Sequence, residues 1–163
     1  MRWTEFAALH PRVCASLQRA KRQGRTGQAY LFQGDSTEFL EEFAMAWAQA
    51  AACMDSGDDG APCGVCQNCR QVESGLYTEL IHLRPQSKSR IITVDAMRQF
   101  EAALSLAVPP GRLKIGIISE AENMGDDAQN AFLKTLEEPP ASTMLLLLTV
   151  NARRLLPTIR SRC

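Results

Sequence analysis

The chain has 163 residues, of which 18 are Lys or Arg and 18 are Asp or Glu, so its formal net charge at pH 7 is zero. This length allows one domain with a sizeable core, and the balanced charge excludes nucleic-acid binding through an overall basic surface, although a local basic patch is compatible with it. The sequence has no apolar run long enough to span a membrane and no signal-peptide core, so we expect a soluble, cytoplasmic protein without a membrane partner.

The first predicted element is an amphipathic helix over residues 10–23. Val13, Leu17 and Ala20 are expected to lie on its buried face. Cys14 stands beside that face, and a cysteine in such a place is most often a small buried residue.

A strand over 29–33 and a helix over 37–52 follow, with Gly34 at the start of the segment between them. The helix carries apolar residues at helical spacing, namely Phe39, Phe43, Ala46, Trp47 and Ala50. A strand, a glycine and a helix in this order are the layout of the phosphate-binding loop G-x-x-x-x-G-K-[ST].

The residues that hold phosphate in such a loop are missing here. Counting from Gly34, Phe39 stands at the second glycine, Leu40 at the lysine and Glu41 at the Mg²⁺-binding Ser or Thr. Further acidic residues at the helix start would repel a triphosphate. Two interpretations stay open: a nucleotide site that has been lost, or a helix start that never bound nucleotide.

Four of the six cysteines lie within one short segment, namely Cys53, Cys63, Cys66 and Cys69. A cluster of this kind in an intracellular chain favours a metal over disulfides, and four thiolates suit a tetrahedral Zn²⁺ ion. Such a zinc would be structural, because four protein ligands leave no open position. An iron–sulfur cluster is an alternative, although no Cys-Pro follows at the required spacing. The second alternative is that the cysteines bind no metal and are either free or paired in disulfides.

The rest of the chain alternates between strands and helices. Strands are predicted over 79–85, 112–119 and 143–150, a short helix over 69–75, and longer helices over 93–107 and 126–138. This order predicts an α/β fold with a parallel sheet, in which ligands bind beyond the carboxyl ends of the strands. Gly34, Ser119 and Thr149 fall at such ends.

The strand over 112–119 ends where an NTPase would carry an acidic pair that holds Mg²⁺ and polarises water. Ser119 stands at the aspartate position, and Glu120 remains. A hydroxyl is a poorer Mg²⁺ ligand than a carboxylate. The phosphate loop and the acidic pair therefore both lack key groups, and we expect neither ATP binding nor intrinsic ATPase activity.

The most specific motifs lie in the last third of the chain. Within "DDAQNAFLKTLEEPP" (126–140), residues 128–140 fit the pattern A-x-N-A-L-L-K-x-L-E-E-P-P, and Ser-Arg-Cys stands at 161–163. Residues 24–34, "GRTGQAYLFQG", fit G-R-L-x-H-A-Y-L-F-x-G. With these motifs the chain resembles the clamp-loader branch of the AAA+ ATPases from about residue 8 onward. Phe132 and Gln28 depart from the patterns, as does "LYTELIHL", where many relatives have His-Pro-Asp.

Within that family, a defective phosphate loop together with a cysteine cluster resembles the delta prime group of bacterial DNA polymerase III subunits. The resemblance implies a single AAA+ core domain over 1–163, a zinc-binding insertion at about 53–75 with the four clustered cysteines as ligands, and lid and collar domains beyond it. It also implies a non-hydrolysing scaffold in a heteropentamer with tau/gamma ATPase subunits and delta, which loads the sliding clamp on primer-template DNA.

The same resemblance implies that Arg162 of Ser-Arg-Cys is an arginine finger in the ATP site of a neighbouring subunit. The residues alone would make it a solvated surface charge. Two other functions stay open. An active ATPase of the tau/gamma type shares the motifs, but Leu40, Glu41 and Ser119 argue against it. An independent zinc-dependent nucleic-acid binder would leave the Leu-Glu-Glu-Pro-Pro and Ser-Arg-Cys segments unexplained.

Overall fold

The computed structural model describes residues 1–86 and 88–163, and it groups them into two compact units. The first unit comprises residues 1–27 and 42–78, and the second comprises residues 28–41 and 79–163. In the part of the chain that is described, no helix combines the length and the apolar character that crossing a membrane requires.

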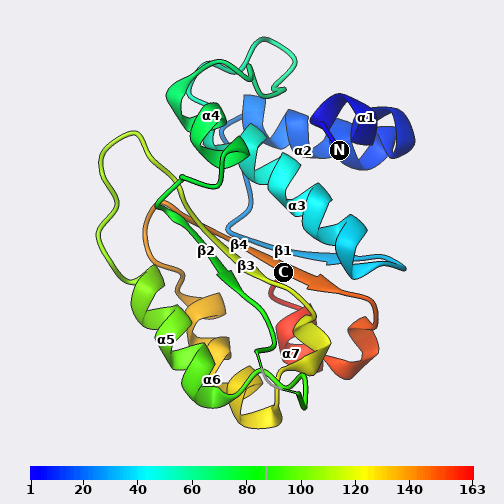
Figure 1. The fold of residues 1–163 in the computed structure, drawn as a ribbon, viewed down its shortest axis with the longest axis vertical. Helices are drawn as coiled ribbons and strands as arrows, with labels where there is room; N and C mark the ends of the chain where they lie inside the picture. Colours follow the sequence, from blue (N-terminus) through cyan, green and yellow to red (C-terminus); the bar gives the residue numbers. More distant parts are fainter. Residues whose placement is uncertain (87) are drawn as a thin grey trace. The chain divides into compact units, whose positions relative to one another are not determined.

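A parallel sheet of four strands forms the centre of the second unit (Figure 1). The strands are β1 (Ala29–Gln33), β2 (Leu80–Leu83), β3 (Lys114–Ile118) and β4 (Thr143–Thr149). Their order is β1-β4-β3-β2, with all neighbours parallel, which confirms the predicted α/β class. The two inner strands are buried along their whole length, as expected for continuous apolar runs in a parallel sheet.

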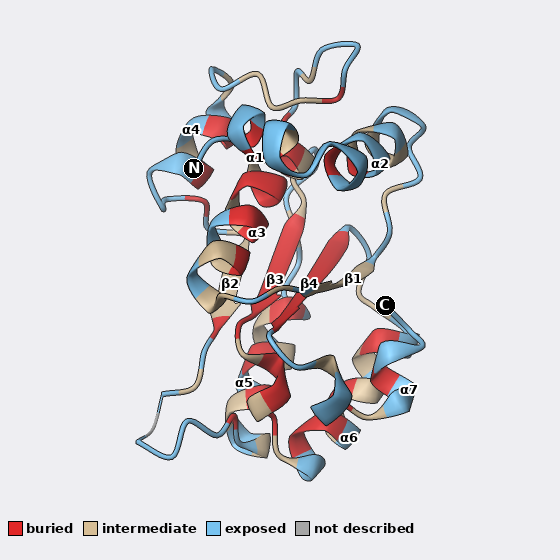
Figure 2. Ribbon diagram, turned by 90° about the vertical axis from the view of Figure 1, so that its right-hand side faces the viewer, coloured by how far each residue is buried: buried red, intermediate tan, exposed pale blue. Residues whose placement is uncertain are grey.

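Helices α5 (Val94–Leu104) and α6 (Asp126–Glu137) cover one face of this sheet (Figures 1 and 2). Thr93 caps α5, because its hydroxyl accepts a hydrogen bond from the N–H of Ala96 at 3.2 Å. The apolar faces of the two helices share one buried cluster with the sheet, which includes Met97, Phe100, Leu104, Phe132, Leu136, Leu145 and Leu147.

Gly116 allows α5 to lie close to β3. A Cβ at this position would lie 2.8 Å from Cζ of Phe100 and 2.9 Å from Cδ2 of Leu104, which is closer than carbon atoms approach without displacement. A glycine inside a strand commonly marks such a close approach. The residue therefore sets the spacing between helix and sheet.

The first unit is helical. It contains α1 (Trp3–Leu9), α2 (Pro11–Arg22), most of α3 (Thr37–Ala52) and α4 (Gln67–Glu73). The aromatic rings of α1 pack on those of α3: Phe6 meets Phe43 edge-on with ring centroids 5.3 Å apart, and Trp3 lies 5.7 Å from Trp47. These contacts fix α1, a short helix that the sequence pattern did not predict.

The predicted buried face of α2 was wrong at one position. Val13 is 44% exposed, whereas Cys14 and Leu17 are buried and Ala20 is half-buried. The helix is turned so that Cys14, Leu17 and Lys21, at spacings of three and four residues, face inward. Hydrophobicity alone cannot find this orientation, because one of the three inward residues is a lysine.

Three further short helices were not predicted: η1 (Ala121–Asn123), η2 (Ala152–Arg154) and α7 (Pro157–Arg160). Each has only three or four residues, so none shows a hydrophobic period. The other predicted helices and strands are present, with ends shifted by a few residues at most.

Candidate metal centre and phosphate-loop region

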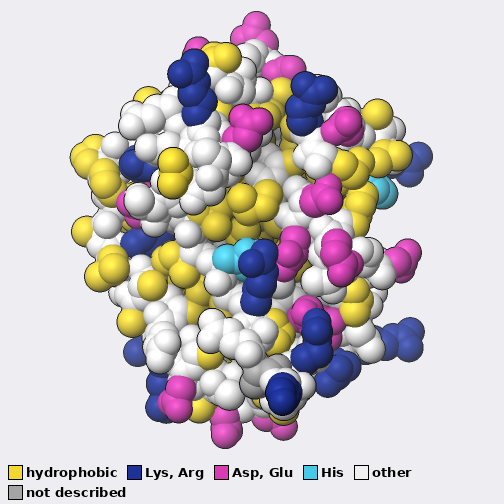
Figure 3. Space-filling view, in the orientation of Figure 1, with side chains coloured by type: hydrophobic (Ala, Val, Ile, Leu, Met, Phe, Trp, Pro, Cys, Tyr) yellow, Lys and Arg dark blue, Asp and Glu magenta, His cyan; other side chains and the backbone are white. Residues whose placement is uncertain are grey.

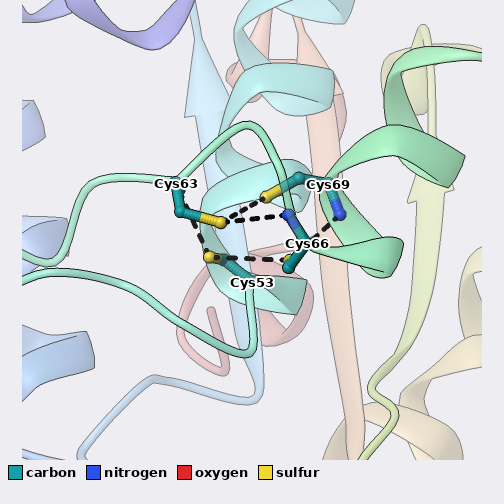
Figure 4. A group of neighbouring side chains, drawn as sticks. All are labelled: Cys53, Cys63, Cys66 and Cys69. Carbon is teal, nitrogen blue, oxygen red and sulfur yellow. Dashed lines mark hydrogen bonds between the residues drawn. The ribbon is translucent and has the colours of Figure 1, made fainter.

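The four clustered cysteines come together in the first unit (Figure 4). Cys53 directly follows α3, Cys63 lies in the next loop, and Cys66 and Cys69 lie at the start of α4. All four Sγ atoms lie within 4.8 Å of one another, and the pairs Cys63–Cys69 and Cys53–Cys66 are each 4.0 Å apart. All four are free thiols, so the possibility of disulfides among them is not realised.

These distances fit a single tetrahedral ion. With Zn–S bonds of about 2.3 Å, the edge of a sulfur tetrahedron is about 3.8 Å, close to the 4.0 Å separations of the two pairs. An iron–sulfur cluster would hold four thiolates farther apart, because its core of several atoms lies between them. The donor set could therefore hold Zn²⁺ as a closed structural site.

The turns between the cysteines direct backbone N–H groups at the sulfurs. The N–H groups of Cys63, Cys66 and Cys69 donate to the Sγ atoms of Cys53, Cys63 and Cys66 at 3.3, 3.3 and 3.4 Å. Burial raises the pKa of the Cys66 thiol, but hydrogen bonds from the N–H groups of Cys69 and Met54 outweigh it and lower that pKa to about 6. Burial raises the pKa of the Cys53 and Cys69 thiols. A bound cation would keep these two as thiolates.

At the phosphate loop, the chain's own leucine packs on the glycine. Gly34 lies at the carboxyl end of β1, where its N–H donates to the carbonyl oxygen of Thr149 at 3.2 Å. Leu40, at the lysine position, is 4% exposed, and its Cδ2 lies 3.2 Å from where a Cβ on Gly34 would be. The N–H of Phe39 donates to the Ser36 hydroxyl at 3.2 Å. A side chain of the loop thus binds an N–H group at the start of α3.

Glu41, at the position of the Mg²⁺-binding hydroxyl, belongs to a polar network. Its carboxylate accepts two hydrogen bonds from the Arg84 guanidinium, at 2.9 and 3.0 Å. Nε2 of His82 lies 3.5 Å from the same carboxylate and 2.7 Å from the Ser119 hydroxyl. Burial raises the pKa of Glu41, but hydrogen bonds from Arg84 and Ser119 outweigh it and lower that pKa. Burial, followed by the positive charge of Arg84, lowers the pKa of His82 to about 4.

Compared with an NTPase, this network has its carboxylate and its hydroxyl in each other's positions. An NTPase holds Mg²⁺ with a hydroxyl on the helix and a carboxylate at the strand end. Here the helix carries Glu41, the strand end carries Ser119, and Arg84 supplies the positive charge. Sequence reasoning found Glu41 and Ser119 separately and missed His82 and Arg84. Their spacing of two residues, which places both on one side of an extended chain, was the available signal.

Glu120, the remaining acidic residue of the pair, binds a different arginine. Its carboxylate is 3.2 Å from Nε of Arg90, accepts a second hydrogen bond from Nη2 of Arg90, and accepts one from the Asn123 side chain at 2.9 Å. Glu120 has a φ of 51°, an uncommon conformation for a residue other than glycine. These three hydrogen bonds hold it in that conformation.

Arg162 lies just after α7 and pairs with a residue of the other C-terminal motif. Its Nη2 is 2.5 Å from Oε1 of Glu137, and its Nη1 donates to the carbonyl oxygen of Thr158 at 3.1 Å. Glu137 is the first glutamate of Leu-Glu-Glu-Pro-Pro. Both side chains are partly exposed, so the guanidinium is held at the surface. Figure 3 shows Lys and Arg interspersed with Asp and Glu over the face drawn, in keeping with the balanced composition.

Known proteins resemble this chain in sequence and in fold. The family model described as "DNA polymerase III, delta subunit" matches residues 9–163. A delta prime subunit of DNA polymerase III from Bacillus subtilis is 35% identical over 99% of the chain, and a tau subunit from Salmonella typhimurium is 36% identical over 93%. The chain spans 48% of the length of the first relative and 23% of the second.

A solved structure shares the fold. A DNA polymerase III gamma subunit-related protein from Thermotoga maritima superposes with a TM-score of 0.62 at 23% sequence identity. The match covers 90% of this chain and 42% of the Thermotoga chain.

Proposed function

The chain belongs to the DNA polymerase III delta subunit family, and we propose that it is the AAA+ core of a bacterial clamp-loader subunit that does not hydrolyse ATP. The likeness to delta prime over nearly the whole chain supports this assignment. In this proposal the cytoplasmic subunit assembles with tau/gamma ATPase subunits and delta in a heteropentamer. It acts as a scaffold while the complex loads the sliding clamp on primer-template DNA.

The observation that carries the proposal is the occupation of the phosphate-loop region by the chain's own groups. Leu40 packs against Gly34 where a lysine would reach phosphate, and Arg84 binds Glu41 where a hydroxyl would hold Mg²⁺. Binding Mg-ATP would require the leucine to move and this ion pair to break. Both changes cost free energy during nucleotide binding, and a phosphate loop with the usual glycine, lysine and hydroxyl does not have this cost.

An active ATPase of the tau/gamma type is the alternative, since tau subunits are also similar to this chain. Calorimetric titration with Mg-ATP separates the two. We expect no saturable heat up to millimolar nucleotide, whereas micromolar binding would contradict a closed nucleotide site and would favour the ATPase.

Arg162 is proposed as the residue that acts on a neighbouring ATP site. A guanidinium presents a planar fork of donors to phosphate oxygens, and its position at the surface is compatible with a contact to another subunit. In a reconstituted loader made with the full-length subunit, Arg162→Ala should lower the ATPase kcat of the complex by at least about tenfold. Arg162→Lys should restore little of it, because an ammonium lacks the fork. An unchanged kcat in an intact complex would reject this role.

The four clustered cysteines are proposed to hold one structural Zn²⁺ ion. Their sulfur separations match a tetrahedral ion, and no coordination position would remain for a substrate. Elemental analysis of the chain, purified without added metal, should find one zinc per molecule. Iron in place of zinc would contradict the assignment.

A further inference from the structure

A lysine next to the cysteine cluster uses all of its donors on the backbone. Lys21 of α2 donates to the carbonyl oxygens of Ala50, Ala51 and Cys53, the last two at 3.2 and 3.0 Å. These carbonyls lie at the end of α3, where an α-helix leaves its last C=O groups without partners. An ammonium has three N–H donors, so each of them is bound.

The same ammonium lies in the electrostatic field of the four sulfurs. The pKa of Lys21 is lowered by burial, and the negative charges of Cys53, Cys69, Cys66 and Cys63 oppose this lowering without reversing it. A divalent ion with four thiolates has a net charge of −2, which is unfavourable in half-buried surroundings without a positive charge nearby. All residues of the first unit are described, and every other Lys, Arg and His among them is exposed.

We propose that Lys21 is a positioning residue of the metal centre, which holds the chain at Cys53 in place and supplies the positive charge that faces the tetrathiolate ion. This proposal rests on the proposed metal binding by the four cysteines. Cys53 is the ligand that directly follows α3, and Lys21 binds its carbonyl oxygen. Loss of the lysine would therefore affect both the placement of a ligand and the charge balance of the site.

The second unit offers a matched control. Lys114 is 2% exposed and donates to the carbonyl oxygens of Ala103 and Leu106 at the end of α5. Like Lys21, it therefore binds carbonyl oxygens at a helix C-terminus, but the four candidate metal ligands belong to the other unit. Lys114→Met removes a buried lysine from a helix end without touching the cysteine cluster.

The test is a competition titration of Zn²⁺, and separately of Co²⁺, against a chromophoric chelator. We expect Lys21→Met to weaken metal affinity by about 10- to 100-fold, the usual effect of losing a partner of a metal ligand. Lys21→Arg should stay within about tenfold of the unmodified chain, because it keeps the charge. Lys114→Met should lower the melting temperature but change metal affinity by no more than about twofold.

Two results would overturn the proposal in different ways. If Lys21→Met binds both metals as tightly as the unmodified chain, Lys21 is only a helix cap, and metal binding by the cysteines stands. If the unmodified chain binds neither metal, the metal site and the role of Lys21 both fail. Should Lys21→Met not fold, Lys21→Gln keeps a donor without the charge. Weakened metal binding by folded Lys21→Gln supports the proposal, and unchanged binding rejects it.

Discussion

The cysteine cluster and the phosphate-loop region both resemble ligand-binding sites, but their side chains have different partners. At the cluster, four thiols face one another, and once ionised they need a cation to balance them. At the phosphate loop, each group faces another part of the chain: Leu40 packs on Gly34, and Arg84 binds Glu41. On the proposed functions, the first region would depend on a bound metal ion for its stability, whereas the second would be stable without a nucleotide.

This difference predicts opposite responses to ligands. Removing metal should destabilise the first unit, while adding nucleotide should leave the second unit unchanged. Substitutions in the two regions test each half of the comparison separately, since the four clustered cysteines lie in one unit, and Leu40, Glu41 and Arg84 lie in the other.

The largest effect is expected from breaking the cluster. Cys69 is fully buried, and Cys69→Ser replaces one thiolate of the proposed metal site by a weaker ligand. We expect the chain to lose about 3 kcal/mol or more of unfolding free energy, because metal binding contributes directly to folding in such sites. Hydrogen exchange should become fast over residues 53–75, as it should when a chelator removes metal from the unmodified chain. Cys163→Ser, at an exposed thiol outside the cluster, should show neither change.

Leu40→Ala tests whether the phosphate-loop region is packed as a core. Leu40 is 4% exposed, so its truncation should cost about 2–4 kcal/mol in urea unfolding. The variant should still bind no Mg-ATP, because the Glu41–Arg84 pair remains. Leu106→Ala, at a side chain that is 67% exposed, is the control and should cost less than about 0.5 kcal/mol. A gain of nucleotide binding in Leu40→Ala would mean that the leucine alone closes the site.

Arg84→Met separates the ion pair from the apolar packing. Glu41 would lose two charge-assisted hydrogen bonds while its side chain stays largely buried, so we expect a loss of about 1–2 kcal/mol. Arg98→Met, which removes an exposed pair with Asp95 at 3.8 Å, should cost less than about 0.5 kcal/mol.

A double variant checks the cause of that loss. Glu41→Gln with Arg84→Met should cost less than the sum of the two single changes, because the largely buried Glu41 carboxylate that Arg84→Met alone would leave unpaired is then absent. Additive costs would show that the two side chains do not stabilise each other.

The fold could be predicted from the sequence in segments where apolar residues follow one regular pattern. The strand over 29–33 and the helix over 37–52 agree with β1 and α3, since the first is a continuous apolar run and the second has apolar residues at regular helical spacing. The apolar run 143–150 was correctly predicted as a strand, and β4 is buried along its whole length. The short helix α1 was missed because its place depends on Trp3 and Phe6 meeting distant rings on α3, which no local pattern contains.

The sites could be predicted from the sequence only where the residue types and their spacing indicate a function by themselves. Four cysteines at short spacing indicate a metal by themselves, and the structure brings them together. The partners of the phosphate-loop residues could not be found this way. His82 and Arg84 lie more than forty residues after Glu41, and no motif links them to it. Lys21 was missed for the same reason, because its role follows from the carbonyls that α3 presents to it.

The smallest effect is a pH dependence that arises from His82. The pKa of this side chain is lowered from 6.5 to about 4 in the folded chain, mainly by burial. Between these values the unfolded state binds a proton that the folded state does not, so the free energy of unfolding falls as pH falls from 6.5 toward 4. Because the ring is not fully buried, solvent screening reduces the effect to about 1 kcal/mol.

This dependence can be measured apart from that of Glu41. The pKa of Glu41 is lowered from 4.5, so its contribution to stability is lost only as pH falls below that value. The Cys66 thiol, whose pKa is lowered to about 6, also takes up a proton between pH 7.5 and pH 5. In urea unfolding at these two pH values, the part of the difference that His82→Asn removes therefore reports on His82. His10→Asn, at an exposed histidine, should retain it. If His82→Asn kept the same difference, the histidine would be as free to take up a proton in the folded chain as in the unfolded one. The phosphate-loop region would then be open to water rather than closed by its own side chains.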